Sequence, residues 1–365
     1  MTRILINDLA RHAEAVKEDV SPALKRVADG GWFVLGPECA AFEREFGDYC
    51  GAAHCVAVAN GTDALELGLR ALGIGPGKRV ATVANAGFYS TTAILQVGAE
   101  PVFVDVTPTN QLMNLDAFET LAASGALDAV IVTHLFGFMH DAAKARRIAD
   151  CAGIFLIEDC AQAHGARRDS KRAGSVGHIG CFSFYPTKNL GALGDGGALI
   201  TNDTKLAAGL RSLRQYGWSE KYHVERLGGR NSRLDEIQAA VLRAKLPRLD
   251  GWNKRRREIG RRYVEGIHNT NVLCPTCDGE DHVAHLYVVE TPDPAGLRAH
   301  LAGADIACDI HYPVPDHRQS AIARLQTWPA LTITERLATR ILTLPCFPEL
   351  TDAEVDRIID RINVW

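Results

Sequence analysis

"FSFYPTKNLGALGDGGA", residues 182–198, joins a short β-prone run to a glycine-rich loop, with one lysine between them. The apolar run ends at Pro186, Lys188 follows, and glycines occupy positions 191, 194, 196 and 197. A lysine is costly to desolvate and usually lies on the surface. Lys188 is therefore either an ordinary exposed loop residue or an amine that takes part in chemistry.

The chain around this stretch alternates between strand and helix patterns. Short apolar, β-prone runs predict strands at residues 54–60, 79–84, 101–106, 128–137, 154–160, 179–185 and 197–201. Apolar residues at helical spacing, with glycine near the ends, predict helices at 63–72, 90–98 and 141–153. This alternation is typical of an α/β domain with a mostly parallel central sheet. Ligands bind such sheets outside the carboxyl ends of the strands, where the Lys188 loop begins.

The pattern changes in the C-terminal third. A long helical region covers about residues 232–266, and strands are expected at 282–290 and 305–312, with helices at 294–303 and 351–365. We predict two domains: a large α/β domain over residues 1–249, which includes the N-terminal segment, and a smaller α+β domain over 250–365.

Composition limits the classes of function. The 365 residues are 47% hydrophobic and 23% charged, as in soluble globular proteins, and the net charge of −4 gives no reason to expect nucleic acid or an anionic membrane as a partner. The opening residues lack the pattern of a secretory signal, and no apolar run has the length of a membrane span. Cys274 and Cys277 form one CxxC without a second ligand pair. Free thiols, no metal and a cytoplasmic location are expected.

Two further stretches bear on Lys188. In "NGTDALELGLRAL", Gly61 and Thr62 precede a helix, and the free N–H groups and positive dipole of a helix start suit a phosphate. A plain N-cap is the alternative. In "IFLIEDCAQAHGA", Glu158 and Asp159 end an apolar strand, where a carboxylate is costly unless it meets a cation or hydrogen-bond donors. A protonated pyridine nitrogen would be such a cation. Gln162, three residues after Asp159, could form a hydrogen bond with a phenolic oxygen on the same ring. The alternative is that the aspartate only caps a helix.

Two weaker stretches complete the set. In "NAGFYSTTAIL", Phe88 and Tyr89 mark a strand-to-helix junction, where an aromatic ring either stacks on a flat cofactor or belongs to the core. In "GGRNSRLDEIQAA", Asn231 and Arg233 precede the long helix and offer donors suited to phosphate, although an N-cap and a surface salt bridge explain them equally well.

In this order and spacing, these motifs resemble the DegT/DnrJ/EryC1/StrS family of pyridoxal 5′-phosphate (PLP) dependent sugar aminotransferases. The resemblance covers nearly the whole chain, including "GWFVLGPECAAFEREFGDYCGAAHC" near the start and "TLPCFPELTDAEVDRII" at the end. The pair "EDCAQAHGA" and "FSFYPTKNLGALGDGG" is its most specific part. The resemblance implies PLP fold type I, the aspartate aminotransferase-like fold, and a homodimer with active sites shared across the interface.

The resemblance also implies a role for each matching residue. Lys188 would hold PLP as a Schiff base and, once displaced, move a proton between the donor Cα and the cofactor C4′. Asp159 would pair with the pyridinium, Gln162 would contact the phenolic oxygen, and Phe88 would lie over the ring. The phosphate would be held by Gly61, Thr62, Ser183 and, from the neighbouring subunit, Asn231. Because the chain keeps its lysine, it is not one of the family's dehydratases, in which histidine replaces that residue.

The implied reaction is ping-pong transfer of an amino group from L-glutamate to a keto sugar linked to a nucleoside diphosphate. Candidate substrate contacts lie in the loop 215–230 and in the "HYP" segment: Trp218, Lys221, Tyr222, His223, Arg230, His311 and Tyr312. The loop could equally be exposed without a substrate role. The alternatives are a glutamine-dependent keto-cyclitol aminotransferase, a PLP-dependent sugar dehydratase or isomerase, and a sensor that binds PLP or a sugar nucleotide.

Overall fold

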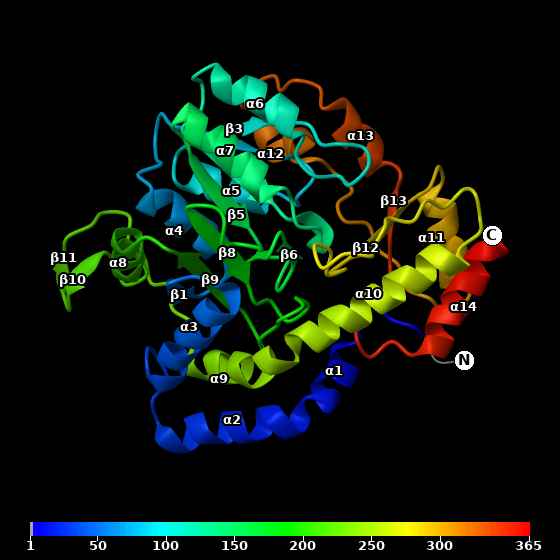
Figure 1. Cartoon of the computed structure of the whole chain (residues 1–365), viewed down its shortest axis with the longest axis horizontal. Helices are drawn as coiled ribbons and strands as arrows, with labels where there is room; N and C mark the ends of the chain where they lie inside the picture. The colour runs from blue at the N-terminus through cyan, green and yellow to red at the C-terminus, as the bar shows by residue number, and fades with distance from the viewer. Residues whose placement is uncertain (1–2) are drawn as a thin grey trace.

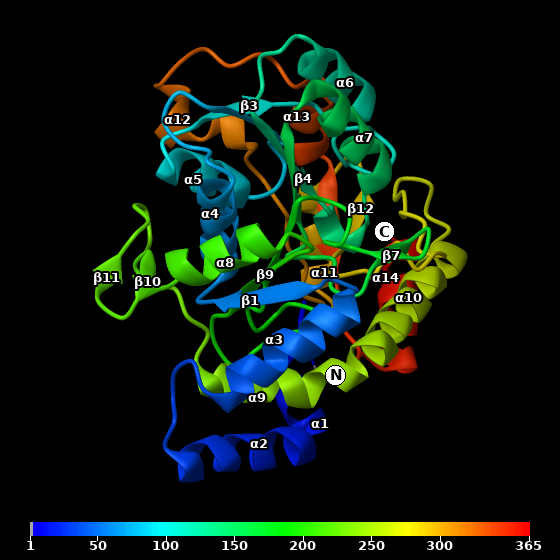
Figure 2. The same ribbon diagram turned by 60° about the vertical axis from the view of Figure 1, so that its left-hand side comes forward.

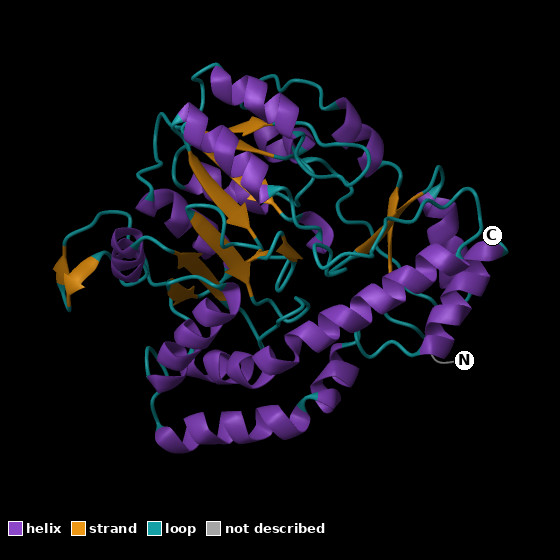
Figure 3. Cartoon of the chain, viewed as in Figure 1, coloured by secondary structure: helices purple, strands orange, loops and turns teal. Residues whose placement is uncertain are grey.

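The computed structural model describes residues 3–365, so residues 1 and 2 of the predicted large domain lie outside the described part. Its centre is a seven-stranded sheet with the spatial order β1-β9-β8-β5-β4-β2-β3 (Figures 1 and 3). β9 runs antiparallel to both of its neighbours, and the other pairs are parallel. The predicted mostly parallel α/β sheet is confirmed. The strands are β1 (His54–Val58), β2 (Arg79–Thr82), β3 (Glu100–Phe103), β4 (Ala129–Thr133), β5 (Phe155–Asp159), β8 (Ile179–Ser183) and β9 (Gly197–Thr201).

Alternate strand residues pack into cores on opposite faces of the sheet. In β4, Ala129 and Ile131 belong to one core, and Val130 and Val132 belong to the other. Burial on both faces explains why these strands are continuously apolar in sequence. The first face is covered by α4 (Gly61–Ala71), α5 (Tyr89–Gln96) and α8 (Thr204–Leu213), and the second by α3 (Pro37–Cys50), α6 (Leu115–Ala123) and α7 (Ala142–Ala152) (Figure 2).

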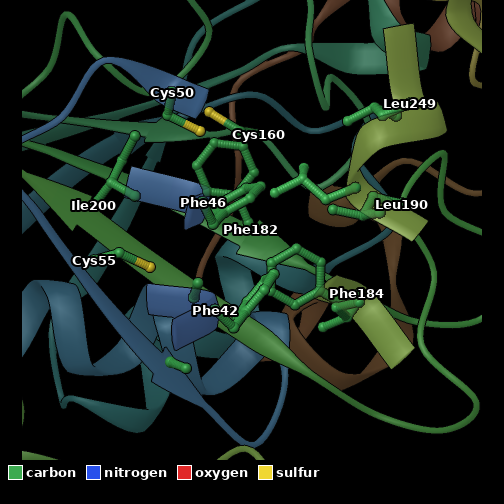
Figure 4. Packing of buried hydrophobic residues seen from close by; sticks show 14 of the residues in the cluster. Phe42, Phe46, Cys50, Cys55, Cys160, Phe182, Phe184, Leu190, Ile200 and Leu249 are labelled. Atoms are coloured by element: carbon green, nitrogen blue, oxygen red, sulfur yellow. The ribbon is translucent and has the colours of Figure 1, made fainter. Parts of the chain in front are cut away.

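An aromatic cluster anchors the end of β8 on the second face. Phe182 and Phe184 pack against Phe42 and Phe46 of α3, with ring centroids 5.0 to 5.3 Å apart (Figure 4). Successive strand side chains point to opposite faces, so Ser183 points toward the face that carries α4. The cluster therefore fixes both the end of the strand and the start of the Lys188 loop.

Helices from the N-terminal and middle parts of the chain pack side by side along one edge of the molecule. α1 (Leu9–Ala15) leads into α2 (Lys17–Gly30), which lies along α9 (Glu236–Lys245) (Figures 1 and 2). α9 continues through a 3-10 turn, η2 (Leu246–Arg248), into α10 (Leu249–Gly266). The helical region predicted at 232–266 is thus confirmed, with a change of helix type at Pro247.

A separate core lies in the C-terminal part. There β12 (Tyr287–Glu290) pairs antiparallel with β13 (Ile341–Leu344), and the pair packs with α10, α11 (Pro294–Ala302) and α14 (Asp352–Asn363). Ile4 packs into the same core. The strand predicted at 305–312 is wrong, because this segment makes only single bridges, from Ile306 to Ile4 and from Asp309 to Thr343. The boundary at residue 249 stays a prediction.

The remaining elements are short. They are η1 (Leu135–Gly137), the hairpin β6 (Arg167–Arg168) and β7 (Lys171–Arg172), η3 (Asp316–Arg318), α12 (Ser320–Ala323), α13 (Thr332–Ala338), and the hairpin β10 (Trp218–Glu220) and β11 (His223–Val224). The β10–β11 hairpin projects from the body beside α8 (Figures 1 and 2). Across residues 3–365, no helix combines the length and the hydropathy needed to cross a membrane.

Candidate active site

A cavity of about 700 Å³ opens at the carboxyl ends of the parallel strands. The wall is formed by the last residue of β4 and by the segments that follow β1, β2, β5 and β8. Nine of the predicted site residues line it: Gly61, Thr62, Asp159, Gln162, Ser183, Lys188, Arg230, His311 and Tyr312. Six predicted residues are absent from the lining: Phe88, Trp218, Lys221, Tyr222, His223 and Asn231.

Lys188 lies in the loop that leaves the aromatic anchor of β8. The loop is held in shape by backbone hydrogen bonds from Lys188 to the Tyr185 carbonyl and from Ala192 to the Phe184 carbonyl, both 2.8 Å long. Burial lowers the pKa of the Lys188 amine to about 8, although the Asp159 carboxylate acts in the opposite direction. The share of the amine that is neutral and nucleophilic near neutral pH is therefore much larger than in an exposed lysine.

Asp159 and its neighbour Glu158 face opposite sides of β5. Asp159 Oδ1 accepts a hydrogen bond from the Ala161 N–H at 3.1 Å, and Oδ2 accepts a longer one from Ser90 Oγ at 3.4 Å. Burial raises the pKa of Asp159, and these donors together with Lys188 act against that rise. The carboxylate that faces the cavity is therefore short of charged partners and suited to a cationic ligand group.

Glu158 is satisfied within the protein. It accepts hydrogen bonds from the backbone N–H groups of Gly174, Val176 and Gly177, at 2.6 to 3.0 Å, and lies 2.9 Å from His134 Nε2. His134 Nδ1 accepts from the His140 N–H, so Nε2 carries the hydrogen that faces Glu158. Burial opposes ionisation, but the hydrogen bond from His134 and the backbone donors hold the pKa of Glu158 below its usual value.

Gln162 bridges two other parts of the wall. Its Oε1 accepts from the Phe136 N–H at 2.6 Å, and its Nε2 donates to the Tyr312 hydroxyl at 3.1 Å. The HYP segment is thereby tied to the loop that follows β5, across 150 residues of sequence. The Phe136 N–H can only donate, so the carbonyl oxygen of the Gln162 amide must face Phe136 and its NH2 group must face Tyr312.

The start of α4 forms a close contact with the end of β8. A Cβ placed on Gly61 would lie 2.6 Å from Ser183 Cβ, and one on Gly197 would lie 2.3 Å from the Asn60 carbonyl oxygen. Glycine at these two positions permits the backbones to approach one another. Asn60 caps the helix by accepting from the Asp63 N–H at 2.8 Å. The first turn and the Ser183 hydroxyl therefore border the cavity together, as an anion site requires.

The aromatic residue that lines the cavity from the α5 junction is Tyr89, not Phe88. Phe88 has a φ of 71° and packs with a small apolar cluster that includes Phe103 and Ile322. Its N–H donates to the buried Asp316 carboxylate at 3.0 Å. The Phe88 side chain therefore lies in the small apolar cluster and not in the cavity. The sequence could not predict this direction, because Phe88 and Tyr89 are adjacent aromatic residues.

The loop 215–230 contributes only its last residue to the cavity. Arg230 pairs with Asp63 at 3.1 Å and also with Glu66, so it is held over the first turns of α4. Tyr222 is 78% exposed on the projecting hairpin, next to the exposed His223. Asn231 is exposed outside the cavity of its own chain. The predicted contacts of these three residues would therefore have to be made with another molecule.

Sequence reasoning missed several residues of the wall. His285 lies in the predicted strand 282–290, of which only β12 (Tyr287–Glu290) is a strand in the structure, and Asp195 lies among the loop glycines. Cys274 is partly exposed and Cys277 is buried, and neither is paired with another cysteine. The signal for His285 was its place just before an apolar run, which does not by itself distinguish a site residue from a core residue.

The sequence and fold match proteins of one family. Residues 14–363 match the DegT/DnrJ/EryC1/StrS aminotransferase family. The chain is 43% identical over 358 residues to the dTDP-3-amino-3,4,6-trideoxy-α-D-glucose transaminase of Micromonospora megalomicea subsp. nigra, covering 96% of this chain and 95% of that protein.

Solved structures agree with the sequence match. DesV of S. venezuelae, in complex with a ketimine intermediate, is similar with a TM-score of 0.96 at 40% identity, covering 100% of this chain and 99% of that one. NtdA of Bacillus subtilis with bound cofactor PMP has a TM-score of 0.93 at 28% identity, covering 99% of this chain and 85% of that one. The chain therefore belongs to the DegT/DnrJ/EryC1/StrS aminotransferase family.

Proposed function

We propose that this aminotransferase uses PLP to move an amino group from L-glutamate to C3 of a keto sugar carried by a nucleoside diphosphate. The observation that carries the proposal is that Lys188 and Asp159 face one cavity, beside the start of α4. The 43% identical relative is named for a 3-amino sugar linked to dTDP, which supports both the sugar class and the position of the amine. A cytoplasmic location remains a prediction.

The residues of the cavity fit PLP. Gly61, Thr62 and Ser183 combine a helix start with two hydroxyls, which suits the phosphate. Asp159, with few charged partners of its own, suits the protonated ring nitrogen. The cavity of about 700 Å³ is large enough for a cofactor together with part of a substrate. When bound, PLP supplies an aldehyde for the amine and an electron sink for the carbanion.

Lys188 serves as the base in this proposal. Its pKa of about 8 lies close to neutral pH, where a general base is most effective. With PLP bound, the Lys188 amine would take the proton from the donor Cα and return it at C4′. In the second half-reaction it would move a proton in the opposite direction, so that the keto sugar becomes the amino sugar. Asp159 would hold the ring nitrogen in its protonated form, because its carboxylate faces the cavity.

Arg230, His311 and Tyr312 are the proposed substrate contacts within one chain, since all three line the cavity. Arg230 lies beside the start of α4, where it pairs with Asp63 and Glu66, and its guanidinium is suited to a diphosphate. Tyr222, His223 and Asn231 lie outside this cavity and are proposed to act on the neighbouring subunit. The projection of the β10–β11 hairpin from the body supports this division (Figure 1).

The proposed homodimer rests on an apolar surface next to the Lys188 loop. Its members are exposed side chains on three joined segments: Trp32, Phe33, Val34, Tyr185, Leu193 and Ile237. Hydrogen bonds join the segments, since the Glu236 N–H donates to the Phe33 carbonyl and the Leu193 N–H donates to Gln238 Oε1. Exposed apolar side chains on neighbouring segments are typical of an interaction site. A second copy of the chain is the occupant we propose.

The test of the reaction uses PLP-loaded protein, excess L-glutamate and no sugar. We expect loss of the visible absorbance band of bound PLP, with release of an equal amount of 2-oxoglutarate. Lys188→Ala is the control, and it should release no 2-oxoglutarate on the same timescale. Addition of a nucleotide-linked 3-keto sugar should then restore the band and yield the amino sugar.

Each other result points to a different alternative. A band that persists with L-glutamate but is lost with L-glutamine would favour the keto-cyclitol aminotransferase. Persistence with both donors would favour a dehydratase or a binding protein. If no band forms and borohydride attaches nothing to Lys188, the cofactor assignment is wrong.

A further inference from the structure

A single buried carboxylate, that of Asp316, attaches the chain after the HYP segment to the start of α5. Asp316 begins η3, and only 1% of its surface is exposed. Its Oδ1 accepts a hydrogen bond from the Phe88 N–H at 3.0 Å, and its Oδ2 accepts one from the Thr91 hydroxyl at 2.6 Å. Its own N–H donates to the Ala84 carbonyl, just after β2, at 2.7 Å. Segments more than 200 residues apart in the sequence, 228 for Phe88, are thereby joined.

Asp316 supplies an acceptor that α5 lacks in its own sequence. The N-cap residue of α5 is Phe88, whose side chain makes no capping hydrogen bond. A carboxylate at a helix start is favoured by the donors and the dipole there. Burial raises the pKa of Asp316 to about 7, and the two hydrogen bonds act against that rise. Among residues 3–365, Asp316 forms no ion pair, and the next two residues, His317 and Arg318, pair with Glu335.

The two segments that Asp316 joins each carry a tyrosine of the cavity wall. Tyr89 is the first residue of α5, and Tyr312 belongs to the HYP segment; both line the cavity. Their rings meet edge to face, with centroids 6.1 Å apart and an interplanar angle of 76°. Gly87 has a φ of 77°, and a Cβ placed on it would lie 2.9 Å from both rings. The pair is therefore packed closely on the backbone, so a shift of either segment would change its shape.

We infer that Asp316 is a positioning residue for the sugar substrate: its carboxylate holds the start of α5 against the HYP segment, so that Tyr89 and Tyr312 present one fixed surface to the keto sugar. The inference rests on the proposed function, in which Tyr312 contacts that sugar. A tyrosine offers an apolar ring and a hydroxyl, which suit a sugar. Asp316 and Thr91 act through the pair, because neither of them lines the cavity.

Three substitutions test the hydrogen bonds of this carboxylate. Asp316→Leu removes both acceptors and keeps a side chain of similar length. Thr91→Val removes only the hydroxyl, so it provides the milder change if Asp316→Leu does not fold. Asp316→Asn keeps an acceptor for the Phe88 N–H, and its NH2 group can donate to the Thr91 oxygen. The conservative variant should therefore retain the function, and thermal unfolding shows whether each variant folds.

The first measurement is steady-state kinetics with L-glutamate and a nucleotide-linked 3-keto sugar. Asp316→Leu should raise the KM for the sugar by about 10-fold or more, because the binding surface is displaced. Its kcat should change by no more than a few-fold, since Lys188 and its loop are not attached to Asp316. Thr91→Val should raise the KM by a few-fold, and Asp316→Asn should stay within about 2-fold of the wild type. A purely structural role would lower the unfolding temperature and leave the KM unchanged.

Glu335→Ala is the matched control. Glu335 is also a carboxylate that anchors this segment, through His317 and Arg318 at 2.9 Å, but it lies on α13. None of these three residues lines the cavity. Glu335→Ala should therefore lower the unfolding temperature without changing the KM for the sugar. An increase in KM as large as that of Asp316→Leu would overturn the role given to the hydrogen bonds with α5.

The second measurement is the geometry of the tyrosine pair in crystal structures of the PLP-loaded proteins without sugar. The ring centroids should stay near 6.1 Å apart in the wild type and in Asp316→Asn. In Asp316→Leu, or in Thr91→Val if the first variant does not fold, at least one ring should move by about 1 Å or more. Rings that do not move would overturn the inference, and so would displaced rings with an unchanged KM.

Failure of the proposed function gives a different result. The wild type itself would then aminate no nucleotide-linked keto sugar, and the substrate assigned to the tyrosine pair would be wrong. The ring geometry is measured without any substrate, so it still decides whether Asp316 positions Tyr89 and Tyr312.

Discussion

Glu158 and Asp159 are neighbours in the sequence, yet the alternation of β5 gives them different surroundings. Glu158 points to the face with His134 and meets three backbone donors. Asp159 points to the cavity, where burial raises its pKa and only a few donors oppose that rise. Residue type alone could not assign these roles, because both side chains are carboxylates at the same strand end.

The pair leads to opposite expectations for two amide substitutions. Glu158→Gln should lower the free energy of unfolding by about 2–4 kcal/mol, because each Glu158 oxygen accepts from two N–H groups and two buried donors would then face an NH2 group. Asp159→Asn should leave stability nearly unchanged but slow the loss of the PLP band with L-glutamate by about 100-fold or more. Denaturant unfolding and stopped-flow absorbance measure the two effects. If one of the two variants were the more impaired in both stability and rate, Glu158 and Asp159 would not have the separate structural and cofactor-binding roles proposed here.

Lys188 gives a prediction on pH. Burial lowers its folded-state pKa from 10.5 to about 8, so between these values the unfolded chain binds more protons than the folded one. The stability of the PLP-free wild type should therefore rise with pH across that window. Lys188→Met does not bury a charged amine, so its unfolding temperature at pH 7 should be on the order of 2 °C higher than that of the PLP-free wild type.

This advantage of Lys188→Met should shrink as pH rises from 8 toward 10.5. Scanning calorimetry of the PLP-free proteins at several pH values measures it. Lys205→Met, on an exposed position of α8, is a control that should show no such pH-dependent gain. A gain for Lys188→Met that does not change with pH would mean that the amine is not desolvated.

At the scale of elements, the start of α4 carries the clearest constraint. Gly61→Ala puts a Cβ 2.6 Å from Ser183 Cβ, so the contact between α4 and β8 must open. We expect PLP to bind at least about 10-fold more weakly, because the helix N–H groups move relative to the Ser183 hydroxyl. Gly68→Ala, in the same helix, meets its nearest side chains at 3.4 to 3.7 Å and should bind PLP normally. Equal PLP affinities for Gly61→Ala and Gly68→Ala would contradict the proposal that the start of α4 binds the phosphate.

Most elements could be predicted from sequence because their periodicity is local. The seven sheet strands and the helices between them follow apolar patterns that any chain segment carries within itself. The segment 305–312 has the same apolar character but makes only single bridges, one to Ile4 and one to Thr343 of β13, and no continuous ladder. A segment becomes a strand only when another strand pairs with it, and the sequence of the segment alone does not show which strand that will be.

At the scale of the whole molecule, the apolar surface beside the Lys188 loop leads to a prediction about assembly. Leu193→Asp places a charge on a half-exposed member of that surface and should convert a dimer into monomers at micromolar concentration. Val364→Asp, on an equally apolar but distant exposed position near the C-terminus, should leave the dimer intact. Sedimentation velocity distinguishes the two. A wild type that sediments as a monomer would contradict the assignment of this surface to a second copy.

The sequence by itself determined the α/β pattern, the place of Lys188 after a buried strand, and the motifs that identify the family. These properties depend on residue types within short windows. The tertiary structure decided which side chains reach the cavity. With a φ of 71° at Phe88, Tyr89 is the aromatic residue that lines the cavity from the α5 junction. His285 Nδ1 lies 3.0 Å from Asn189 Oδ1, across 96 residues of sequence. The direction of a side chain depends on backbone angles and on partners distant in sequence, which no local pattern encodes.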